Sequence, residues 1–306
     1  MSRPTPTIAP PTNPRMVELL SGLATHEGFS ASRLPGVKFM RSTLYVPPSP
    51  IAYDPSIVII AQGRKAGRLG DRRFVYDANN YLVLTVPMPF ECETFGRPEE
   101  PVLGLSVGVT PTVVAELLMQ IENPPGATDA RPQAIEAAPL DARLSAAAVR
   151  LLEALQYPDE SRILGPSLVR ELTYHALLGP LGANLRALAA PHTHFGQISR
   201  VLNRIHRDFD QSIDVETLAQ DAGMSVSTFH THFKAVTSSS PLQYLKTIRL
   251  HKARQLMVHD GFNAAAAALR VGYESASQFS REFKRHFGDT PAAVAASLRR
   301  DLIRLA

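Results

Sequence analysis

The stretch from residue 276 to residue 287 gathers basic, amide and hydroxyl side chains on one side of a predicted helix. Phe279, Phe283 and Phe287 recur every four residues and define a buried face, so the polar residues between them face outward. Among these, Arg281 carries a guanidinium that can form a bidentate pair with guanine. The stretch contains no obvious catalytic group, so its chemistry is that of hydrogen bonding to a polyanion. A solvated face of an ordinary core helix is the simpler alternative for this stretch taken alone.

The same arrangement occurs twice along the chain. The shared residues of the first copy are Ala219, Gly223, Phe229, Phe233, Lys234 and Pro241, and those of the second are Ala268, Gly272, Phe279, Phe283, Lys284 and Pro291. A small residue, a turn glycine four positions later, and then a helix with two phenylalanines four residues apart predict a helix-turn-helix unit. We therefore expect two such units, each with one recognition helix, which favours DNA recognition over the simpler alternative.

A single long helix is predicted between the two units. Ser240 suits the N-cap position, Pro241 suits the first helical position, and Gln243 completes a capping box. A helix over residues 241–259 would be about 28 Å long. Because successive major grooves on one face of B-DNA are about 34 Å apart, such a helix could hold two recognition helices in neighbouring grooves. Its apolar face is predicted to comprise Leu242, Leu245, Ile248, Leu256 and Met257.

The residues expected to face DNA are those left over once the buried stripe of each recognition helix is assigned. On the first helix the stripe is Val226, Phe229, Phe233 and Val236, and the outward residues are Ser227, Thr228, His230, Thr231 and Lys234. On the second helix they are Ser277, Gln278, Ser280, Arg281, Lys284 and Arg285. The two lysines and Arg285 are expected to meet phosphates or to stay solvated. Helix capping explains the serines and threonines equally well.

Long segments of the chain resemble a known family. The segments "YLKTIRLHKARQLM" and "VGYESASQFSREFKRHFGDTP" resemble the AraC/XylS family of bacterial transcription regulators, over about residues 197–297. Upstream, "RELTYHALLGPLGANLR" and "YDPSIVIIAQGRKAGRLGDRRFVYDANNYLVLTVPMPFE" resemble the N-terminal regulatory domain of one AraC subgroup. Two positions depart from the family pattern. Ser238 stands where the family often has glycine, and "PAAVAAS" lacks the tyrosine-arginine that commonly follows the final proline.

The resemblance implies a sequence-specific regulator that binds double-stranded promoter DNA. It implies a barrel that binds an unknown small-molecule effector, forms a homodimer, or does both. It also implies activation through contact with RNA polymerase, with repression left open. By alignment with the family, the positions expected near base edges are Ser227, His230, Thr231, Ser277, Ser280 and Arg281.

The sequence texture indicates an α+β fold. Short alternating or apolar runs between residues 37 and about 110, with a hairpin turn expected at 77–80, predict a cupin-like β-barrel. Helical periodicity begins near residue 113, so helices flank this barrel. The C-terminal domain is expected to be all-α, with two helix-turn-helix units joined by a linker helix. The expected boundaries are 1–15 for a disordered Pro-rich tail, 16–190 for the regulatory domain, 191–197 for a linker and 198–306 for the DNA-binding domain.

Aromatic residues on the predicted strands are candidates for lining the barrel and binding an effector. Alternation sends only half of a strand's side chains inward, so each is nearly as well explained as plain core or outer face. Cys92 is either a sensor thiol or a small buried hydrophobic residue, and the carboxylates of Glu91 and Glu93 would disfavour its reactivity if they lay close to it. The candidate ligand-binding residues are Tyr45, Phe74, Tyr76, Tyr81, Phe90 and Cys92.

Two other sets of residues have structural or metal-binding interpretations. Arg249 and Arg254 are expected on the linker helix, where ion pairs with Asp or Glu could brace the two units, and bracing is favoured for Arg249. The motif His-Thr-His occurs at 192–194 and 230–232. Residues two apart do not share a helical face, so the second motif cannot chelate a metal by itself. The first lies in the expected linker with no acidic cluster beside it, and no metal site is predicted.

Composition and charge limit the class of protein. Hydrophobic residues make up 44% and charged residues 20%, as in a globular protein. The longest apolar runs are strand-length and prolines occupy the N-terminus, so we expect a cytoplasmic protein with no membrane partner. The single cysteine, Cys92, excludes an internal disulfide framework. Residues 197–306 hold 15 Lys and Arg against 10 Asp and Glu, which favours a polyanionic partner for this part.

Two alternatives remain open at the level of sequence. A metal-dependent cupin enzyme fused to a DNA-binding domain would need clustered histidines on its strands, and residues 27–174 contain no histidine. We accordingly expect no enzymatic activity, no catalytic residue and no cofactor. A nonspecific architectural DNA protein would need basic charge spread widely, whereas Ser, Thr, His and Arg on the recognition helices favour base reading.

Overall fold

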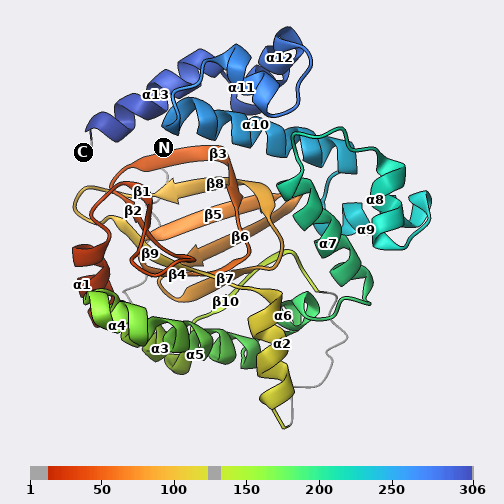
Figure 1. Cartoon of the computed structure of the whole chain (residues 1–306). Helices are drawn as coiled ribbons and strands as arrows, with labels where there is room; N and C mark the ends of the chain where they lie inside the picture. Colours follow the sequence, from red (N-terminus) through yellow and green to blue (C-terminus); the bar gives the residue numbers. More distant parts are fainter. Residues whose placement is uncertain (1–12, 123–131, 305–306) are drawn as a thin grey trace, which may run out of the picture.

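The computed structural model describes residues 13–122 and 132–304. Two β-sheets and a layer of helices form the N-terminal domain, and the C-terminal domain is helical (Figure 1). The predicted α+β class is therefore confirmed. One layer of helices covers one side of the sheets, and the C-terminal helices lie against the opposite side (Figure 1).

The strands form two open antiparallel sheets. The larger sheet has the order β1 (Gly28–Ala31), β2 (Val37–Ser42), β9 (Val102–Gly108), β4 (Ser56–Gln62), β7 (Asn80–Leu84), β10 (Ile135–Pro139). The smaller has the order β3 (Tyr45–Tyr53), β8 (Met88–Phe95), β5 (Arg64–Leu69), β6 (Arg72–Asp77). Because these sheets are not joined into one by strand pairing, the cupin-like architecture is present without a closed barrel.

The turn expected at residues 77–80 is present, but it does not form a hairpin. Strand β6 ends at Asp77 and β7 begins at Asn80, yet the two strands belong to different sheets. The Asp77 carboxylate accepts hydrogen bonds from the Asn79 backbone N–H (3.0 Å) and the Asn80 side-chain amide (2.8 Å). The side chain of Asp77 therefore directs the chain from one sheet to the other.

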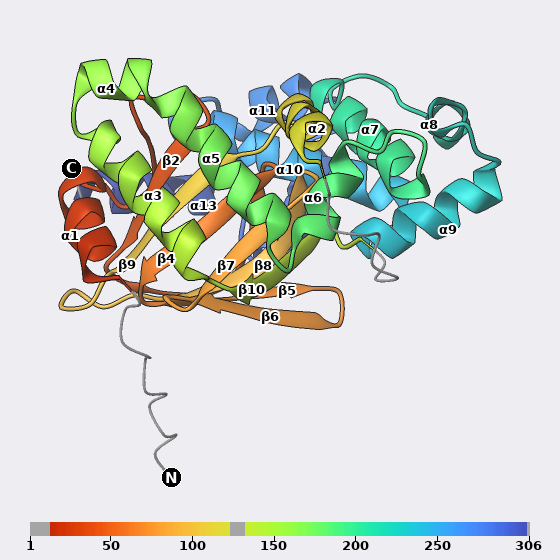
Figure 2. The same cartoon turned by 90° about the horizontal axis from the view of Figure 1, so that it is seen from below.

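Helices cover the outer face of the larger sheet. They are α1 (Pro14–Leu23), α2 (Pro111–Gln120), α3 (Ala142–Leu155), α4 (Pro158–Ile163), α5 (Gly165–Leu178) and α6 (Gly182–Leu188). Side-chain caps start α1, α2 and α3 at Asn13, Thr110 and Asp141. Figure 2 shows α3 and α5 lying over the strands of this sheet.

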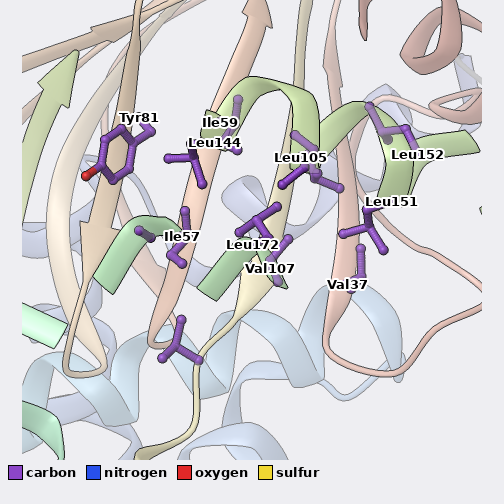
Figure 3. Packing of buried hydrophobic residues seen from close by; sticks show 14 of the residues in the cluster. Val37, Ile57, Ile59, Tyr81, Leu105, Val107, Leu144, Leu151, Leu152 and Leu172 are labelled. Carbon is purple, nitrogen blue, oxygen red and sulfur yellow. The ribbon is translucent and has the colours of Figure 1, made fainter. Parts of the chain in front are cut away.

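The larger sheet is buried on both faces, which explains why β4 is buried along almost its whole length. On one face Ile57, Ile59 and Tyr81 pack against Leu144 and Leu172 of the helical layer (Figure 3). The other face of the sheet contributes to a second hydrophobic cluster, which extends between the sheets and into the C-terminal domain. The two domains thus share continuous apolar packing.

The C-terminal domain contains two similar helical units. Helices α7 (His194–Arg207), α8 (Val215–Ala222), α9 (Val226–Thr237) and α10 (Pro241–His259) precede α11 (Ala264–Arg270), α12 (Ala276–Phe287) and α13 (Pro291–Arg304). The predicted N-cap Ser240 and first-turn Pro241 of α10 are confirmed, and the Ser240 side chain accepts from the Gln243 N–H. Two residues expected to be buried are exposed instead, namely Leu242 (52%) and Val226 (40%).

Two sequence boundaries differ from the helices observed. The Pro-rich tail expected at 1–15 lies outside the described residues up to residue 12, and α1 begins at Pro14 because Asn13 caps it. Helix α7 begins at His194, inside the expected linker 191–197, because the Thr193 hydroxyl accepts from the Gly196 N–H. Among the described residues, no helix is both long enough and apolar enough to span a membrane.

Candidate nucleic-acid interface

The first helix-turn-helix unit is built from α8 and α9. Helix α8 ends at Gly223, whose φ of +66° is the left-handed conformation that glycine adopts readily. Ser225 then caps α9 by accepting from the Thr228 N–H. Phe229 and Phe233 are fully buried, with ring centroids 5.4 Å apart, and they fix α9 on the domain core.

The second unit repeats this construction with α11 and α12. Gly272 has a φ of +83°, and Ser275 caps α12 by accepting from the Gln278 N–H. Phe279 and Phe283 are fully buried and 5.4 Å apart, as in the first unit. The sequence repeat therefore corresponds to a structural repeat, and both recognition helices expose the face opposite their phenylalanines.

All of the predicted DNA-facing residues of α9 are exposed, but some of their polar atoms are already hydrogen-bonded. Thr228 Oγ1 accepts from Ser225 Oγ (2.8 Å), and Thr231 Oγ1 donates to the Ser227 carbonyl (3.1 Å). The five residues Ser227, Thr228, His230, Thr231 and Lys234 are all exposed. They lie together along one side of the helix, as the sequence predicted.

On α12 the predicted residues fall into three groups. Ser277, Arg281 and Lys284 are exposed, whereas Ser280 is half-buried and donates to the Ala276 carbonyl (2.9 Å). Gln278 is exposed and donates from Nε2 to Glu282 Oε1 (3.2 Å). Within the described chain, the guanidinium of Arg281 and the ammonium of Lys284 make no hydrogen bond or ion pair with another residue. These two groups are therefore available to an external partner.

Arg285 lies apart from the other predicted DNA residues. It lines an interdomain cleft of about 350 Å³ together with Arg68, Glu91 and Pro50 of the small sheet. Its position near the end of α12 therefore turns it toward the regulatory domain as well as toward solvent. The sequence could not reveal this because it shows only the helix to which Arg285 belongs.

Arg249 braces the two units, but it does so without a carboxylate partner. Its guanidinium donates to the carbonyls of Phe209 (2.7 Å), Gln211 (2.8 Å) and Gly272 (2.9 Å). Phe209 and Gln211 lie between α7 and α8, and Gly272 forms the turn of the second unit. The bracing role is thus confirmed, and main-chain carbonyls replace the expected Asp or Glu.

Glu282 connects the second recognition helix to the linker helix, a role that the sequence analysis missed. Lys246 Nζ donates to its Oε1 (2.9 Å) and the Tyr273 hydroxyl to its Oε2 (2.8 Å). Burial raises the pKa of Glu282, but the hydrogen bonds from Lys246, Gln278 and Tyr273 outweigh it and leave this pKa below its ordinary value. The carboxylate is therefore ionised at neutral pH and holds α12 against α10.

Tyr244 and Arg254 of α10 dock the C-terminal domain on the N-terminal domain. The Tyr244 hydroxyl donates to the carbonyl of Pro87 and contacts His206 Nε2 at 2.8 Å. Arg254 donates to the Pro50 carbonyl (3.1 Å) and lies 4.6 Å from the centre of the Phe287 ring. Burial lowers the pKa of Arg254 to about 10. Arg254 therefore joins the two domains, which corrects the expectation that it braces the two helix-turn-helix units.

Ser238 ends the first recognition helix in a left-handed conformation, with φ of 57°. A side chain in this region costs roughly 1–2 kcal/mol. Ser238→Gly should therefore raise the free energy of unfolding by about 1 kcal/mol, as measured by urea denaturation. Ser239→Gly is the matched control, because residue 239 has no positive φ. A gain of equal size in the control would contradict this explanation.

The candidate effector residues divide between three environments. Tyr45 is 54% exposed and its hydroxyl donates to Glu93 (2.7 Å), so its expected place inside the barrel is wrong. Tyr81 is buried in the layer between sheet and helices (Figure 3), so it is part of this core and does not line the interior between the sheets. The residues found in the cluster between the sheets are Phe74, Tyr76, Phe90 and Cys92.

The interior of the two-sheet domain also contains Lys65, which the sequence analysis missed. The Cys92 thiol contacts the Tyr76 hydroxyl (3.2 Å), and Lys65 Nζ donates to the Tyr53 hydroxyl (3.1 Å). Alternation places Glu91 on the outer side of β8, where it pairs with Arg68. The carboxylates of Glu91 and Glu93 therefore lie on the opposite side of β8 from the thiol. Their carboxylates bond to outer residues.

Histidines from the two His-Thr-His motifs meet in space. His194 Nδ1 lies 2.6 Å from His232 Nε2, so one imidazole of each motif joins the start of α7 to α9. In residues 13–122 and 132–304, no group of three or more His, Cys, Asp or Glu side chains is arranged to hold a metal ion. The contact is a hydrogen bond between helices, which the spacing within either motif could not predict.

Comparison with known proteins identifies both domains. Residues 33–184 match the family described as the AraC-type transcriptional regulator N-terminus, and residues 218–297 match a helix-turn-helix domain family. Over 95 residues the chain is 38% identical to the HTH-type transcriptional regulator AlkR of Acinetobacter baylyi, covering 31% of each chain. Over 125 residues it is 27% identical to the HTH-type transcriptional activator RhaS of Escherichia fergusonii, covering 41% of this chain and 45% of that one.

The fold resembles that of ToxT from Vibrio cholerae. The TM-score is 0.55 at 12% identity, over 86% of this chain and 98% of ToxT. The matches to the curated relatives span less than half of those proteins' length. The two family matches, the paired helix-turn-helix units and the two-sheet regulatory domain agree with one another. The chain belongs to the AraC family of transcription regulators, with an AraC-type regulatory domain and a helix-turn-helix DNA-binding domain.

Proposed function

We propose that this regulator recognises a specific promoter sequence in the cytoplasm by reading one DNA box with each recognition helix. The observation that supports the proposal is the duplicated exposed face of α9 and α12, carried on units that Arg249 holds together. The residues assigned to base edges are Ser227, His230, Thr231, Ser277, Ser280 and Arg281. Thr228 and Gln278 flank them, and Lys234, Lys284 and Arg285 are assigned to phosphates.

Selection of randomised duplex DNA by the full-length protein, at one stated salt concentration, tests this function. We expect enrichment of two boxes about one helical turn apart. Equal affinity for all sequences would instead support an architectural DNA protein. The proposal includes no enzymatic reaction, so turnover of a small substrate by the purified protein would contradict that part of it.

We further propose that the regulatory domain responds to a small molecule and that the outcome is activation through RNA polymerase. The relatives named RhaS are transcriptional activators, and a ToxT structure with 11% identity and a TM-score of 0.55 holds an unsaturated fatty acid. An effector would act by binding unequally to conformers, or to monomer and homodimer, that differ in DNA affinity. Transcription in vitro from the selected sequence, with and without the protein, distinguishes activation from repression.

Arg281→Ala should weaken binding to the selected DNA by about 1–3 kcal/mol and relax the preference at one base pair. The reason is the exposed guanidinium, which no other described residue engages. A repeated selection with the variant measures the effect position by position. If every base preference stayed the same, the assignment of Arg281 to a base edge would be wrong.

Lys284→Ala should have a different effect, because an ammonium contacts phosphate without reading the base. We expect a similar loss of affinity on all sequences and a salt dependence whose slope falls by about 1. Fluorescence anisotropy titrations on selected and scrambled duplexes at several salt concentrations measure both quantities. A loss confined to the selected duplex would reassign Lys284 to base recognition.

A further inference from the structure

We propose that the cleft between α6, the segment leading into α7, and the first recognition helix α9 binds a small organic anion with an apolar body. This inference deepens the proposed function, on which it rests, by assigning a place and a chemical class to the effector. The cleft has a volume of about 820 Å³. Sites for small molecules span roughly 300–1,000 Å³, so the space suits a ligand of moderate size.

Small apolar residues create this space. Ala183, Ala187 and Ala190 form the wall on the side of α6, Ala235 faces them from α9, and the buried Phe195 closes one side. Alanine contributes the smallest apolar side chain, and four alanines on facing surfaces leave the helices separated by a lined cavity instead of interlocked side chains. The apolar part of a ligand would replace water against this surface.

The charged and polar groups of the cleft favour an anion. Arg186 lies in the wall, where Nη1 reaches the Leu177 carbonyl at 3.3 Å, and no carboxylate pairs with it among the described residues. The His194 and His232 imidazoles lie at the same cleft, and among the described residues that line it there is no Asp or Glu. A guanidinium beside an apolar surface matches a carboxylate or sulfonate attached to an apolar body.

The position of the cleft links ligand binding to DNA recognition. Its α6 wall belongs to the regulatory domain, whereas Thr231, His232 and Ala235 belong to the first recognition helix. Thr231 is also one of the residues assigned to DNA. A ligand that contacts both walls binds most tightly at one relative placement of α6 and α9, so its affinity and the DNA affinity are coupled.

Two fluorescent probes test the site in the full-length protein. Anilinonaphthalene sulfonate combines an apolar body with an anion, and N-phenylnaphthylamine is the same body without the anion. We expect saturable binding of both probes. Ala183→Phe fills the cleft from α6, so it should lower the affinity for both probes by about tenfold or more. Ala146→Phe on α3 is the matched control, because Ala146 is also a half-buried helical alanine but lies outside the cleft.

Arg186→Gln tests the charge without relying on a filled cavity. This substitution should lower the affinity for the sulfonate probe by about tenfold, which is the effect of losing one charge-assisted hydrogen bond. The affinity for the neutral probe should stay nearly unchanged. Equal effects on both probes, or none on either, would overturn the assignment of an anion to this cleft. If Ala183→Phe left the affinity for both probes unchanged, the probes would bind outside this cleft, and the proposed site would be wrong.

The link to DNA is measured with the duplex obtained by selection. Saturating sulfonate should change the affinity for this duplex, and the duplex should change the affinity for the sulfonate by the same factor. Ala183→Phe should abolish this coupling while retaining specific DNA binding. Sequence-specific binding without any coupling would overturn the cleft as effector site and leave the proposed function standing. Absence of sequence-specific binding under all conditions would overturn the proposed function itself.

Discussion

Replacing Arg249 with methionine should lower the free energy of unfolding of the DNA-binding domain by about 3 kcal/mol or more. The guanidinium donates to three main-chain carbonyls, at Phe209, Gln211 and Gly272. Methionine keeps the apolar stem but removes all three donors, and hydrogen bonds from charged groups contribute about 1.5–3 kcal/mol each. The expected loss is smaller than three such contributions, because carbonyls near the surface can accept hydrogen bonds from water once the guanidinium is removed.

Urea denaturation followed by circular dichroism measures this loss. Arg249→Lys should fall between the parent and the methionine variant, since an ammonium can reach fewer of the three carbonyls. Arg200→Met on α7 provides the control, because Arg200 is exposed. The methionine variant should also lose the fixed spacing between its two DNA boxes. A change below about 0.5 kcal/mol would show that Arg249 has no bracing role.

Acidification should destabilise the protein strongly between pH 6.5 and pH 4, and His206 is a main cause. Burial lowers the pKa of His206 to about 4, and the nearby Lys252 adds to this shift while Asp54 opposes it. In the unfolded chain the imidazole returns to its ordinary pKa of 6.5. The unfolded state therefore binds a proton in this window when the folded state does not, so the free energy of unfolding falls as the pH falls.

The expected loss from His206 is about 3 kcal/mol when the pH has dropped to 4. Burial also lowers the pKa of His286 to about 4 and that of His251 well below its ordinary value, so the total loss is larger. Urea denaturation at several pH values measures the slope. In His206→Asn the free energy of unfolding should change less steeply with pH. The value for the same variant at pH 7.5 is the baseline for this comparison. An unchanged slope would mean that His206 titrates normally in the folded protein.

The C-terminal domain was more predictable from sequence than the regulatory domain, for a physical reason. Phe229, Phe233, Phe279 and Phe283 lie four residues apart on helices with one buried face, so the period of 3.6 identifies that face directly. In the larger sheet both faces are buried, and alternation identifies two sets of residues without telling which core each joins. For Tyr81, alternation therefore leaves both cores open, and only the structure places it against the helical layer.

Strand β3 shows a second limit of sequence-based prediction. It contains Pro47, Pro48 and Pro50, which argue against a strand because proline cannot donate a hydrogen bond to a ladder. The strand forms because it lies at the edge of the smaller sheet, with an irregular register between Val46 and Ser49. Edge position is a tertiary property, and the local sequence does not contain it.

Contacts between distant parts were likewise beyond the sequence. The pairing of His194 with His232, and the docking of Tyr244 and Arg254 on the regulatory domain, join residues far apart in the chain. Spacing rules apply within a single element and cannot reveal which element lies opposite. The assignment of Arg249 to bracing succeeded, but its partners were carbonyl groups that every residue possesses.

Because the acceptors are main-chain carbonyls, the two sides of these contacts differ in how well they tolerate mutation. Arg249, Tyr244 and Arg254 supply donors from side chains, whereas their partners at Phe209, Gly272, Pro50 and Pro87 contribute only main-chain oxygen. Side chains on the accepting surfaces can therefore change while these hydrogen bonds persist. The N-terminal domain can therefore diverge in sequence during evolution without detaching from the helix-turn-helix domain.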